Sequence, residues 1–455
     1  MIQTSTIMLV ISSFLSFFGV VYAIDIWLLI FSSSLIKRRP HKIEVKCWPK
    51  VSIHIPLYNE ENVAARILNA CLNLDYPKDK IEIIVLDDSN DETTSIVKEF
   101  EKKKPNLIKV IHRNSREGFK AGALQNALKY TTGEIIALFD ADHVPSRDFL
   151  KKLIPYLLAD KNIAFVQTKF NCLNFKENWI VKSIAIASEF YNKINLNGRA
   201  KLDFLLHFRG GGGIFKRNVL EEVGGWQSDT LAEDLDLSIR LFLAGKKGVY
   251  ISEETCLEEM PATLLDLIRQ QQRWVKGFAQ CFKKHAFSII KSEKISLLKK
   301  FDALIYLSTC FAYPLAFFGL IFGFFFSQIF PQNFILANLF KNYVLTFNFS
   351  ANILSYSAFL TAMSLTLFSK EFKVNFLKIL YVISLVLILI PILIFTNSIA
   401  VIEAFIKKKH IFYRTRKIGG SINNFLILSN NNFIHNLKKP IISFLESLDF
   451  PKLLS

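Results

Sequence analysis

Apolar residues are concentrated towards the two ends of the chain, and the middle alternates short apolar runs with charged segments. Residues 7–31 form an almost wholly apolar run of 25 residues, which is enough to cross roughly 30 Å of hydrocarbon at about 1.5 Å per residue. Further apolar runs occupy 301–330, 343–368 and 377–405. The pattern predicts a water-exposed middle domain with membrane segments on both sides.

The first apolar run is followed, not preceded, by positive charge at Lys37, Arg38, Arg39 and Lys42. A cleavable signal peptide would have a shorter apolar core, positive charge before it and a small-residue cleavage site after it. We therefore expect 1–36 to be an uncleaved anchor. Because basic residues stay on the cytoplasmic side, the next domain is expected in the cytoplasm.

The last apolar run, 377–405, is longer than one crossing needs and contains Pro391 and Asn397. Three full crossings after the middle domain would put the basic stretch 407–417 outside, against the charge rule. We expect this run to bend, with its later part at the interface or re-entering the membrane. The membrane region is then 301–406, followed by a cytosolic segment and tail, 407–455.

The net charge of +17 gathers beside the apolar runs, which favours contact with anionic membrane lipids. No nucleic-acid-binding module accompanies it, so we expect no nucleic-acid partner. The six cysteines include no C-x-x-C pair, which fits buried thiols in a reducing compartment. Together these features predict a multi-pass membrane protein with a cytoplasmic middle domain, and we expect it in a bacterial inner membrane.

The middle domain, 50–285, alternates predicted strands with predicted helices. The strands are 51–56, 81–86, 108–112 and 134–139, and the helices are 60–72, 93–103 and 120–129. This order indicates an α/β, doubly wound, mostly parallel sheet. Ligands bind such sheets beyond the carboxyl ends of the strands, and two acidic clusters fall there.

The first acidic cluster is Asp87-Asp88, which could accept hydrogen bonds from a nucleobase or ribose; it also suits a turn and a helix cap. The second is Asp140-Ala141-Asp142. Two carboxylates at a strand end could face a hard divalent cation that also binds phosphate oxygens, although acidic strand-to-loop turns are common.

A third acidic cluster, Glu233 to Asp236, precedes an apolar helical run. It could supply a general base or simply favourable charge at a helix N-terminus, and spacing does not choose between them. Lys120 starts a predicted helix and suits a phosphate, or solvent. The glycine run 210–213 permits close backbone approach or a flexible turn.

The run Gln270-Gln271-Gln272-Arg273-Trp274 lies in an amphipathic stretch, 264–276, before the membrane region. Arg273 could grip a phosphate with its planar guanidinium, and Trp274 could stack on a sugar ring. The alternative is an interfacial Trp/Arg anchor.

In this order, the residues resemble the motifs D, D-x-D, T-E-D and Q-x-x-R-W of the processive family 2 glycosyltransferases. The stretches 223–226, 231–237, 259–261 and 271–274 are similar to cellulose synthase-like proteins, particularly the mannan and glucomannan synthase branch and its bacterial relatives. The resemblance covers about 50–284, roughly half of the chain. It implies a GT-A-type nucleotide-sugar-binding domain.

The resemblance implies a role for each motif residue. Asp234 would be the base that deprotonates the acceptor hydroxyl, giving inversion at the anomeric carbon. Asp140 and Asp142 would hold Mg²⁺ or Mn²⁺ with the donor diphosphate. The remaining substrate contacts would come from Asp87, Asp88, Lys120, Glu233, Gln270, Arg273 and Trp274.

The chain departs from the family pattern in two motifs. Ala232 replaces the Thr of T-E-D, and the acceptor motif Phe-Cys-Gly or Phe-Asn-Gly reads Phe208-Arg209-Gly210. A weaker resemblance at 412–417 is to the F-x-V-T-x-K gating loop that covers the donor in cellulose synthases. Its presence also favours a cytoplasmic position for that segment.

The expected partners are a UDP- or GDP-hexose donor, a glycan or glycolipid acceptor and membrane lipids. One hypothesis is a synthase of a β-linked polysaccharide. The other is an enzyme that adds one or a few sugars to a membrane lipid such as diacylglycerol. A non-catalytic transporter subunit would explain the apolar runs but not the four motifs.

Overall fold

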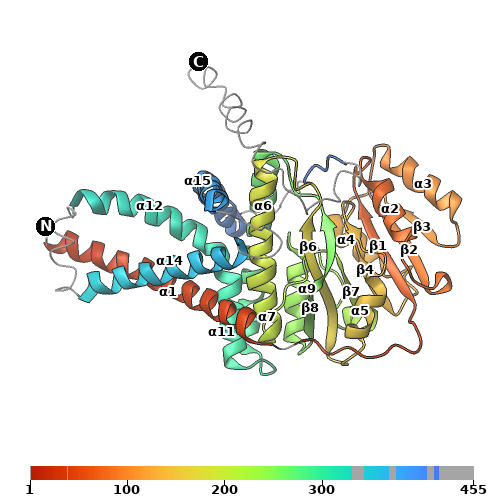
Figure 1. The fold of residues 1–455 in the computed structure, drawn as a ribbon, viewed down its shortest axis with the longest axis horizontal. Helices are drawn as coiled ribbons and strands as arrows, with labels where there is room; N and C mark the ends of the chain where they lie inside the picture. Colours follow the sequence, from red (N-terminus) through yellow and green to blue (C-terminus); the bar gives the residue numbers. More distant parts are fainter. Residues whose placement is uncertain (1, 38, 330–342, 368–375, 407–413, 420–455) are drawn as a thin grey trace, which may run out of the picture.

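The computed structural model describes residues 2–37, 39–329, 343–367, 376–406 and 414–419. A sheet domain lies on one side and a group of long helices on the other (Figure 1). The sheet has the order β3-β2-β1-β4-β7-β6-β8-β5. Its strands are β1 Val51–Leu57, β2 Ile81–Asp87, β3 Ile108–His112, β4 Ile135–Leu138, β5 Val144–Pro145, β6 Ile163–Cys172, β7 Gly213–Lys216 and β8 Lys247–Glu258.

Four of the seven strand pairings are parallel, and they include all those among β1 to β4. Helices cover both faces, which confirms the predicted α/β, doubly wound fold. The antiparallel strands β7 and β5 were not predicted. The helices of this domain are α2 Ala64–Leu72, α3 Thr93–Lys103, α4 Phe119–Ala127, α5 Phe149–Leu157, α6 Trp179–Phe190, α7 Asn197–Lys201, α8 Arg217–Glu222 and α9 Glu233–Leu243.

Alternate residues of the central strands enter two separate cores. In β4, Ile135 and Ala137 pack with α2 and α5 on one face, whereas Ile136 and Leu138 pack with α4, α8 and α9 on the other. A strand that is buried on both faces reads as a continuous apolar run, which is why these strands were recognisable. The single-turn helices η1 Lys78–Lys80 and η3 Thr309–Phe311 and the π-helix η2 Tyr191–Leu196 complete this inventory.

The long helices are α1 Ile2–Leu35, α10 Leu264–Lys291, α11 Leu297–Ser308, α12 Ala312–Ile329, α14 Tyr343–Leu367 and α15 Phe376–Ile406. Among the described residues, three stretches are long and apolar enough to cross a membrane: Leu9–Leu35, Leu297–Phe325 and Ile388–Ile406. They overlap three of the four predicted apolar runs. The fourth run forms α14, which lacks that degree of hydropathy.

Helices α1, α12 and α14 run across the view beside one another, whereas α15 is seen closer to end-on (Figure 1). Asn348 of α14 donates to Ser12 Oγ of α1 at 2.7 Å. Helix α15 continues through Pro391 without a break and contacts α10, where Lys276 pairs with Glu403 at 2.8 Å. The predicted bend is therefore not an interruption of the helix.

Candidate active site

The acidic clusters follow two strands that share a neighbour. Strand β1 pairs in parallel with both β2 and β4, so the carboxyl ends of all three strands lie at one edge of the sheet. Asp87 ends β2, and Asp140 is the second residue after the end of β4. The structure thus brings both clusters to the edge where the sequence predicted a ligand site.

Within the first cluster, Asp87 has a structural set of contacts. Its carboxylate is fully buried and accepts hydrogen bonds from Ser89 N (3.0 Å), Thr94 Oγ1 (2.7 Å) and His112 Nδ1 (2.9 Å). These bonds hold the turn between β2 and α3, as expected for an Asp in such a turn. A ligand contact from Asp87 stays a prediction.

Asp88 is held by a residue that was not recognised from the sequence. Arg113 donates from Nε at 2.7 Å and from NH2 at 2.5 Å to the two carboxylate oxygens of Asp88. Nearby, the guanidinium of Arg116 lies 3.2 Å from the ring centroid of Tyr58. The signal for Arg113 was its position directly after β3, at the same sheet edge.

In the D-x-D cluster, each carboxylate contacts a lysine ammonium. Asp140 Oδ1 lies 2.6 Å from Lys120 Nζ, and Asp142 Oδ2 lies 2.7 Å from Lys417 Nζ. Burial alone would raise the pKa of Asp142, but Lys417 and the backbone N–H of Glu259 keep that pKa well below its usual range. Both carboxylates therefore lie in positions that attract cations.

The D-x-D pair fits the protein's share of a divalent-metal site. Its oxygens suit Mg²⁺ or Mn²⁺, and the Asp140 side chain is about one-third exposed. Within the described residues no three His, Cys, Asp or Glu side chains converge as a metal site. Such an ion would therefore need further ligands, for which donor phosphates are suited.

Lys120 connects the D-x-D pair with the third acidic cluster. Besides Asp140, its Nζ lies 3.7 Å from Glu233 and donates to the carbonyl oxygen of Gly210 at 2.8 Å. Burial disfavours the charged amine, but Asp140 and then Glu233 raise the pKa of Lys120 above its ordinary value. Lys120 is thus a fixed cation between two carboxylates, as a phosphate-binding lysine needs to be.

The third cluster begins helix α9, and its carboxylates face different ways. Asp236 is fully buried and pairs with Lys284 (2.7 Å), His285 (2.7 Å) and Arg240 (2.8 Å), so it is structural. Asp234 accepts from the N–H of Leu235 at 2.8 Å and lies 3.5 Å from His207 Nε2. Only Glu233 and Asp234 are on the Lys120 side.

The pKa values of the two site carboxylates move in opposite directions. Burial raises the pKa of Glu233, and neighbouring Asp234 adds to this against the opposing effect of Lys120. Burial also acts to raise the pKa of Asp234, but His207, Lys120 and the Leu235 N–H outweigh it and lower that pKa. Asp234 is therefore the carboxylate better kept ionised at neutral pH.

Close backbone approach brings the glycine run and α10 to these carboxylates. A Cβ on Gly211 would lie 2.6 Å from His143 Cε1, and a Cβ on Gly277 would lie 2.6 Å from that of Ala232. Gly277 thus lets α10 pack against the N-terminus of α9. The predicted close-approach role of the glycine run is consistent with this geometry.

Helix α10 carries the Q-x-x-R-W residues. Gln270 is buried, and its Oε1 has no hydrogen-bond partner among the described residues. Burial lowers the pKa of Arg273, against the opposing effects of Glu233, Asp234 and Asp140, so its guanidinium shares their electrostatic environment. Trp274 is 39% exposed, so its ring remains accessible to a ligand or to lipid.

A segment from the far end of the chain covers this edge of the site. In residues 414–419, Arg414 pairs with Glu60 at 2.8 Å, and Lys417 donates to the Glu259 carbonyl at 2.8 Å as well as contacting Asp142. The Ile418 N–H donates to Glu259 Oε1 at 2.6 Å. Phe412 and Tyr413 of the gating-loop resemblance lie outside the described residues.

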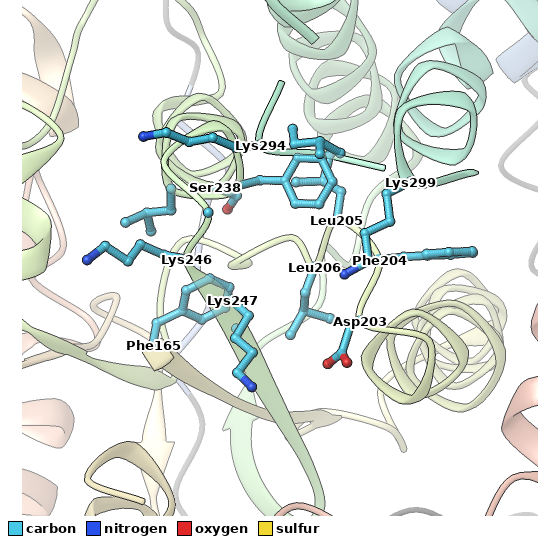
Figure 2. A pocket seen from close by; sticks show the side chains of 15 residues that line it. Phe165, Asp203, Phe204, Leu205, Leu206, Ser238, Lys246, Lys247, Lys294 and Lys299 are labelled. Atoms are coloured by element: carbon cyan, nitrogen blue, oxygen red, sulfur yellow. The ribbon is translucent and has the colours of Figure 1, made fainter. Parts of the chain in front are cut away.

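A cavity of about 210 Å³ lies elsewhere, between α9, the start of β8 and the connection from α10 to α11 (Figure 2). Its lining includes apolar side chains such as Leu206 and Phe242 together with the charged side chains of Asp203, Lys294 and Lys299. None of the predicted site residues lines it. The predicted catalytic residues therefore lie at the sheet edge and not in this cavity.

Comparison with known proteins agrees with the geometry of the sheet edge. Residues 52–224 match the family model described as Glycosyl transferase family 2. This region of the chain therefore belongs to the family 2 glycosyltransferases. Its curated relatives include glucomannan mannosyltransferases, which belong to the cellulose synthase-like branch that its motifs resemble.

Two of these relatives have similar coverage. The chain is 34% identical over 265 residues to probable glucomannan 4-beta-mannosyltransferase 2 of Oryza sativa subsp. japonica, covering 56% of this chain and 46% of the relative. It is 34% identical over 260 residues to glucomannan 4-beta-mannosyltransferase 9 of Arabidopsis thaliana, covering 56% and 49%. The chain thus spans about half the length of the curated relatives that it matches.

A solved structure supports the fold over a longer stretch. A mannosyltransferase from Pyrobaculum calidifontis, in complex with GDP-Man and Mn2+, aligns with a TM-score of 0.52 and 21% sequence identity. The alignment covers 87% of this chain and 98% of that one. The likeness confirms the predicted GT-A-type fold.

Proposed function

We propose that the protein is a membrane-bound, inverting glycosyltransferase that adds a hexose from a nucleotide-sugar donor to a growing β-linked polysaccharide. The observation that carries this proposal is the convergence on Lys120 of Asp140 at 2.6 Å and Glu233 at 3.7 Å, with Asp234 next in sequence. Carboxylates for a metal, a cation for phosphate and a carboxylate base are the groups that sugar transfer requires.

In this proposal Asp234 takes the proton of the acceptor hydroxyl as that oxygen attacks the anomeric carbon. Lys120 and Arg273 offset the negative charge that develops on the diphosphate leaving group. Asp88 and Arg113 lie at the donor end, and Trp274 offers its exposed ring to the acceptor. Gln270 has an unpaired buried oxygen among the described residues, which suits a ligand hydroxyl.

Asp140 and Asp142 are the residues that would hold Mg²⁺ or Mn²⁺ in this proposal. Such an ion neutralises charge on the departing diphosphate. The structurally similar mannosyltransferase was solved with Mn2+ and GDP-Man, which supports a divalent ion and a nucleotide-sugar donor here.

The second candidate function is glycosylation of a membrane lipid, and the altered acceptor motif keeps it open. Arg209 stands where the acceptor motif has Cys or Asn. Its guanidinium lies 4.5 Å from the Phe170 ring centroid, 3.2 Å from Asn192 Oδ1 and 3.8 Å from Glu258. Arg209 therefore places an ordered positive charge at the acceptor end, where the family motif has an uncharged Cys or Asn.

The test supplies membranes containing the protein with labelled UDP-glucose, UDP-GlcNAc, UDP-galactose or GDP-mannose, plus Mg²⁺ or Mn²⁺. Membranes with the Asp234→Asn variant are the control. Label in high-mass material that a glycanase degrades is the expected result. Label in the organic phase would replace the polysaccharide proposal with the lipid one, and no variant-sensitive transfer from any donor would overturn both.

The position of 414–419 also bears on membrane topology. Because this segment contacts the sheet domain, the chain must cross any membrane an even number of times between α10 and residue 414. An interfacial α15 after crossings by α12 and α14 meets this requirement, and so does a pair of crossings by α12 and α15. The relatives reported above are from plants, so they do not support the predicted bacterial membrane.

Removing the Lys417 ammonium should strengthen metal binding before the donor arrives. Lys417 contacts Asp142 directly, so a divalent cation must displace it to reach that carboxylate. We expect Lys417→Ala to lower the Kd for Mn²⁺ by roughly tenfold, about 1.4 kcal/mol, in titrations of donor-free protein. Arg416→Ala, which removes the same charge from an exposed neighbour, should leave Kd unchanged; equal effects of both would contradict a specific contact.

A further inference from the structure

His207 lies between the proposed catalytic base and two tyrosine hydroxyls. Its Nε2 is 3.5 Å from Asp234 Oδ2, and its Nδ1 is 3.1 Å from Tyr306 Oη and 3.4 Å from Tyr191 Oη. The ring is largely buried, and Nε2 makes no hydrogen bond of good geometry among the described residues. A buried ring nitrogen is thus directed at the one carboxylate on which the transfer depends.

The contacts of His207 with the Tyr191 and Tyr306 hydroxyls and with Asp234 indicate which ring nitrogen carries the proton. Tyr191 and Tyr306 hydroxyls are 2.6 Å apart, so one donates to the other. If Tyr191 donates to Tyr306, the Tyr306 hydroxyl donates to Nδ1, and the proton of the neutral ring sits on Nε2. The opposite tautomer would turn the Nε2 lone pair towards the Asp234 carboxylate, which is unfavourable. With the proton on Nε2, a tyrosine hydroxyl donates to His207 Nδ1 and the Nε2–H faces the Asp234 carboxylate.

Four separate elements hold the hydrogen-bonded side chains of His207, Tyr306 and Tyr191 in place. His207 precedes β7, Tyr191 begins the π-helix η2, and Tyr306 lies on α11. The Phe278 ring of α10 packs edge-on against both the His207 and Tyr306 rings, with centroids 5.8 and 5.4 Å away. Single-turn π-helices are frequent at functional sites, and here the π-helix starts at Tyr191.

We propose that His207 is a positioning residue for Asp234: its Nε2–H orients the carboxylate for the arriving acceptor hydroxyl. This inference rests on the proposed function. During transfer the acceptor oxygen gives its proton to Asp234 and bonds to the anomeric carbon, while the bond from that carbon to the diphosphate oxygen breaks and its electron pair leaves with the diphosphate. The 3.5 Å contact is expected to shorten in the productive complex, as catalytic hydrogen bonds do.

The pH dependence of transfer should report the pKa of Asp234, which depends on His207 and on the other charged groups around it. His207 and Lys120 lower the pKa of Asp234 against burial, which raises it. Without His207, the effect of burial is opposed less strongly. The pKa of Asp234 should therefore rise, and Asp234 should keep its proton to higher pH. Further charged groups that act on Asp234 or on the two tyrosines include Glu233, Arg273, Arg209 and Arg199.

The test compares His207→Phe, His207→Gln and Tyr306→Phe in the full chain. We expect His207→Phe to lower kcat by roughly 10- to 100-fold, leave the donor KM within about twofold, and move the acidic limb of the kcat profile to higher pH. His207→Gln, whose amide can donate, should recover part of kcat, and Tyr306→Phe should shift the same limb by less. Thermal unfolding and donor binding show whether each variant is folded.

Two results would overturn the positioning role of His207. A folded His207→Phe protein with wild-type kcat and an unmoved acidic limb overturns the positioning role, and so does a loss explained by donor KM alone. If His207→Phe does not fold, the same criteria apply to His207→Gln and Tyr306→Phe. Absence of transfer by the wild-type protein overturns the proposed function itself, which separates the two failures.

Discussion

Replacing Asp234 by Asn should lower turnover by roughly 10²- to 10⁴-fold, the usual contribution of a general base, while the Kd for the donor stays within about threefold. The amide matches the carboxylate in shape but cannot accept the acceptor proton. Its neighbours Lys120 and His207 would keep their positions, because their other contacts do not involve Asp234. Single-turnover transfer and donor titration on the same preparation measure the two effects separately.

The matched control for this prediction is Asp236→Asn, two residues along the same helix. Asp236 pairs with Lys284, His285 and Arg240, so its loss leaves three buried or half-buried basic groups short of a partner. We expect lowered thermal stability with transfer retained by the folded fraction. Full transfer by Asp234→Asn would show that another group takes the proton.

The pH profile offers a further check on the same assignment. The pKa of Asp234 lies below its ordinary value because His207 and Lys120 outweigh burial. The base is therefore ionised throughout the neutral range, and activity should be lost only as pH falls through that lowered pKa. A profile whose acidic limb lies near neutrality would instead point to Glu233, whose pKa is raised by burial and by Asp234.

Local patterns were sufficient for the sheet around β1 and for its ligand edge. Helix 93–103 and strand 108–112 were predicted with the bounds that the structure has, because the apolar periodicity and the flanking turn residues agree there. Strands with both faces buried gave continuous apolar runs. The polar residues that follow them marked the edge, so Asp88 and Asp140 were found from the sequence.

Contacts between distant segments could not be predicted in this way. Lys417 reaches Asp142 across 275 residues, and no periodicity in either segment specifies that pairing. His207 and Tyr306 are 99 residues apart, and each alone reads as an ordinary buried aromatic residue. The separate roles of Asp234 and Asp236 also required structure, because only the positions of Lys284 and His285 show which carboxylate is already neutralised.

Replacing Arg199 by Met should destabilise the protein by roughly 3–5 kcal/mol, the usual cost of leaving buried charges unpaired. Arg199 is fully buried on α7, where NH1 contacts both oxygens of Asp302 at 2.9 and 2.7 Å and NH2 lies 3.3 Å from Asp25. Asp25 and Asp302 belong to two of the candidate membrane spans. Without the guanidinium, two carboxylates would remain together in an apolar setting.

The measurement is thermal unfolding in detergent or nanodiscs, where we expect the apparent Tm of Arg199→Met to fall by roughly 3–5 °C. Arg217→Met is the matched control, since Arg217 pairs only with exposed Glu221 among the described residues and such pairs are worth about 0–1 kcal/mol. Adding Asp25→Asn and Asp302→Asn to Arg199→Met should recover most of the loss, because no uncompensated charge is then buried. A triple variant no more stable than Arg199→Met would mean that the guanidinium acts through packing, including its place 4.1 Å from the Tyr306 ring, and not through charge. In that case Arg199, Asp25 and Asp302 would support the hydrogen bonds of His207 by packing alone. Arg199 would then affect the active site through its contact with the Tyr306 ring.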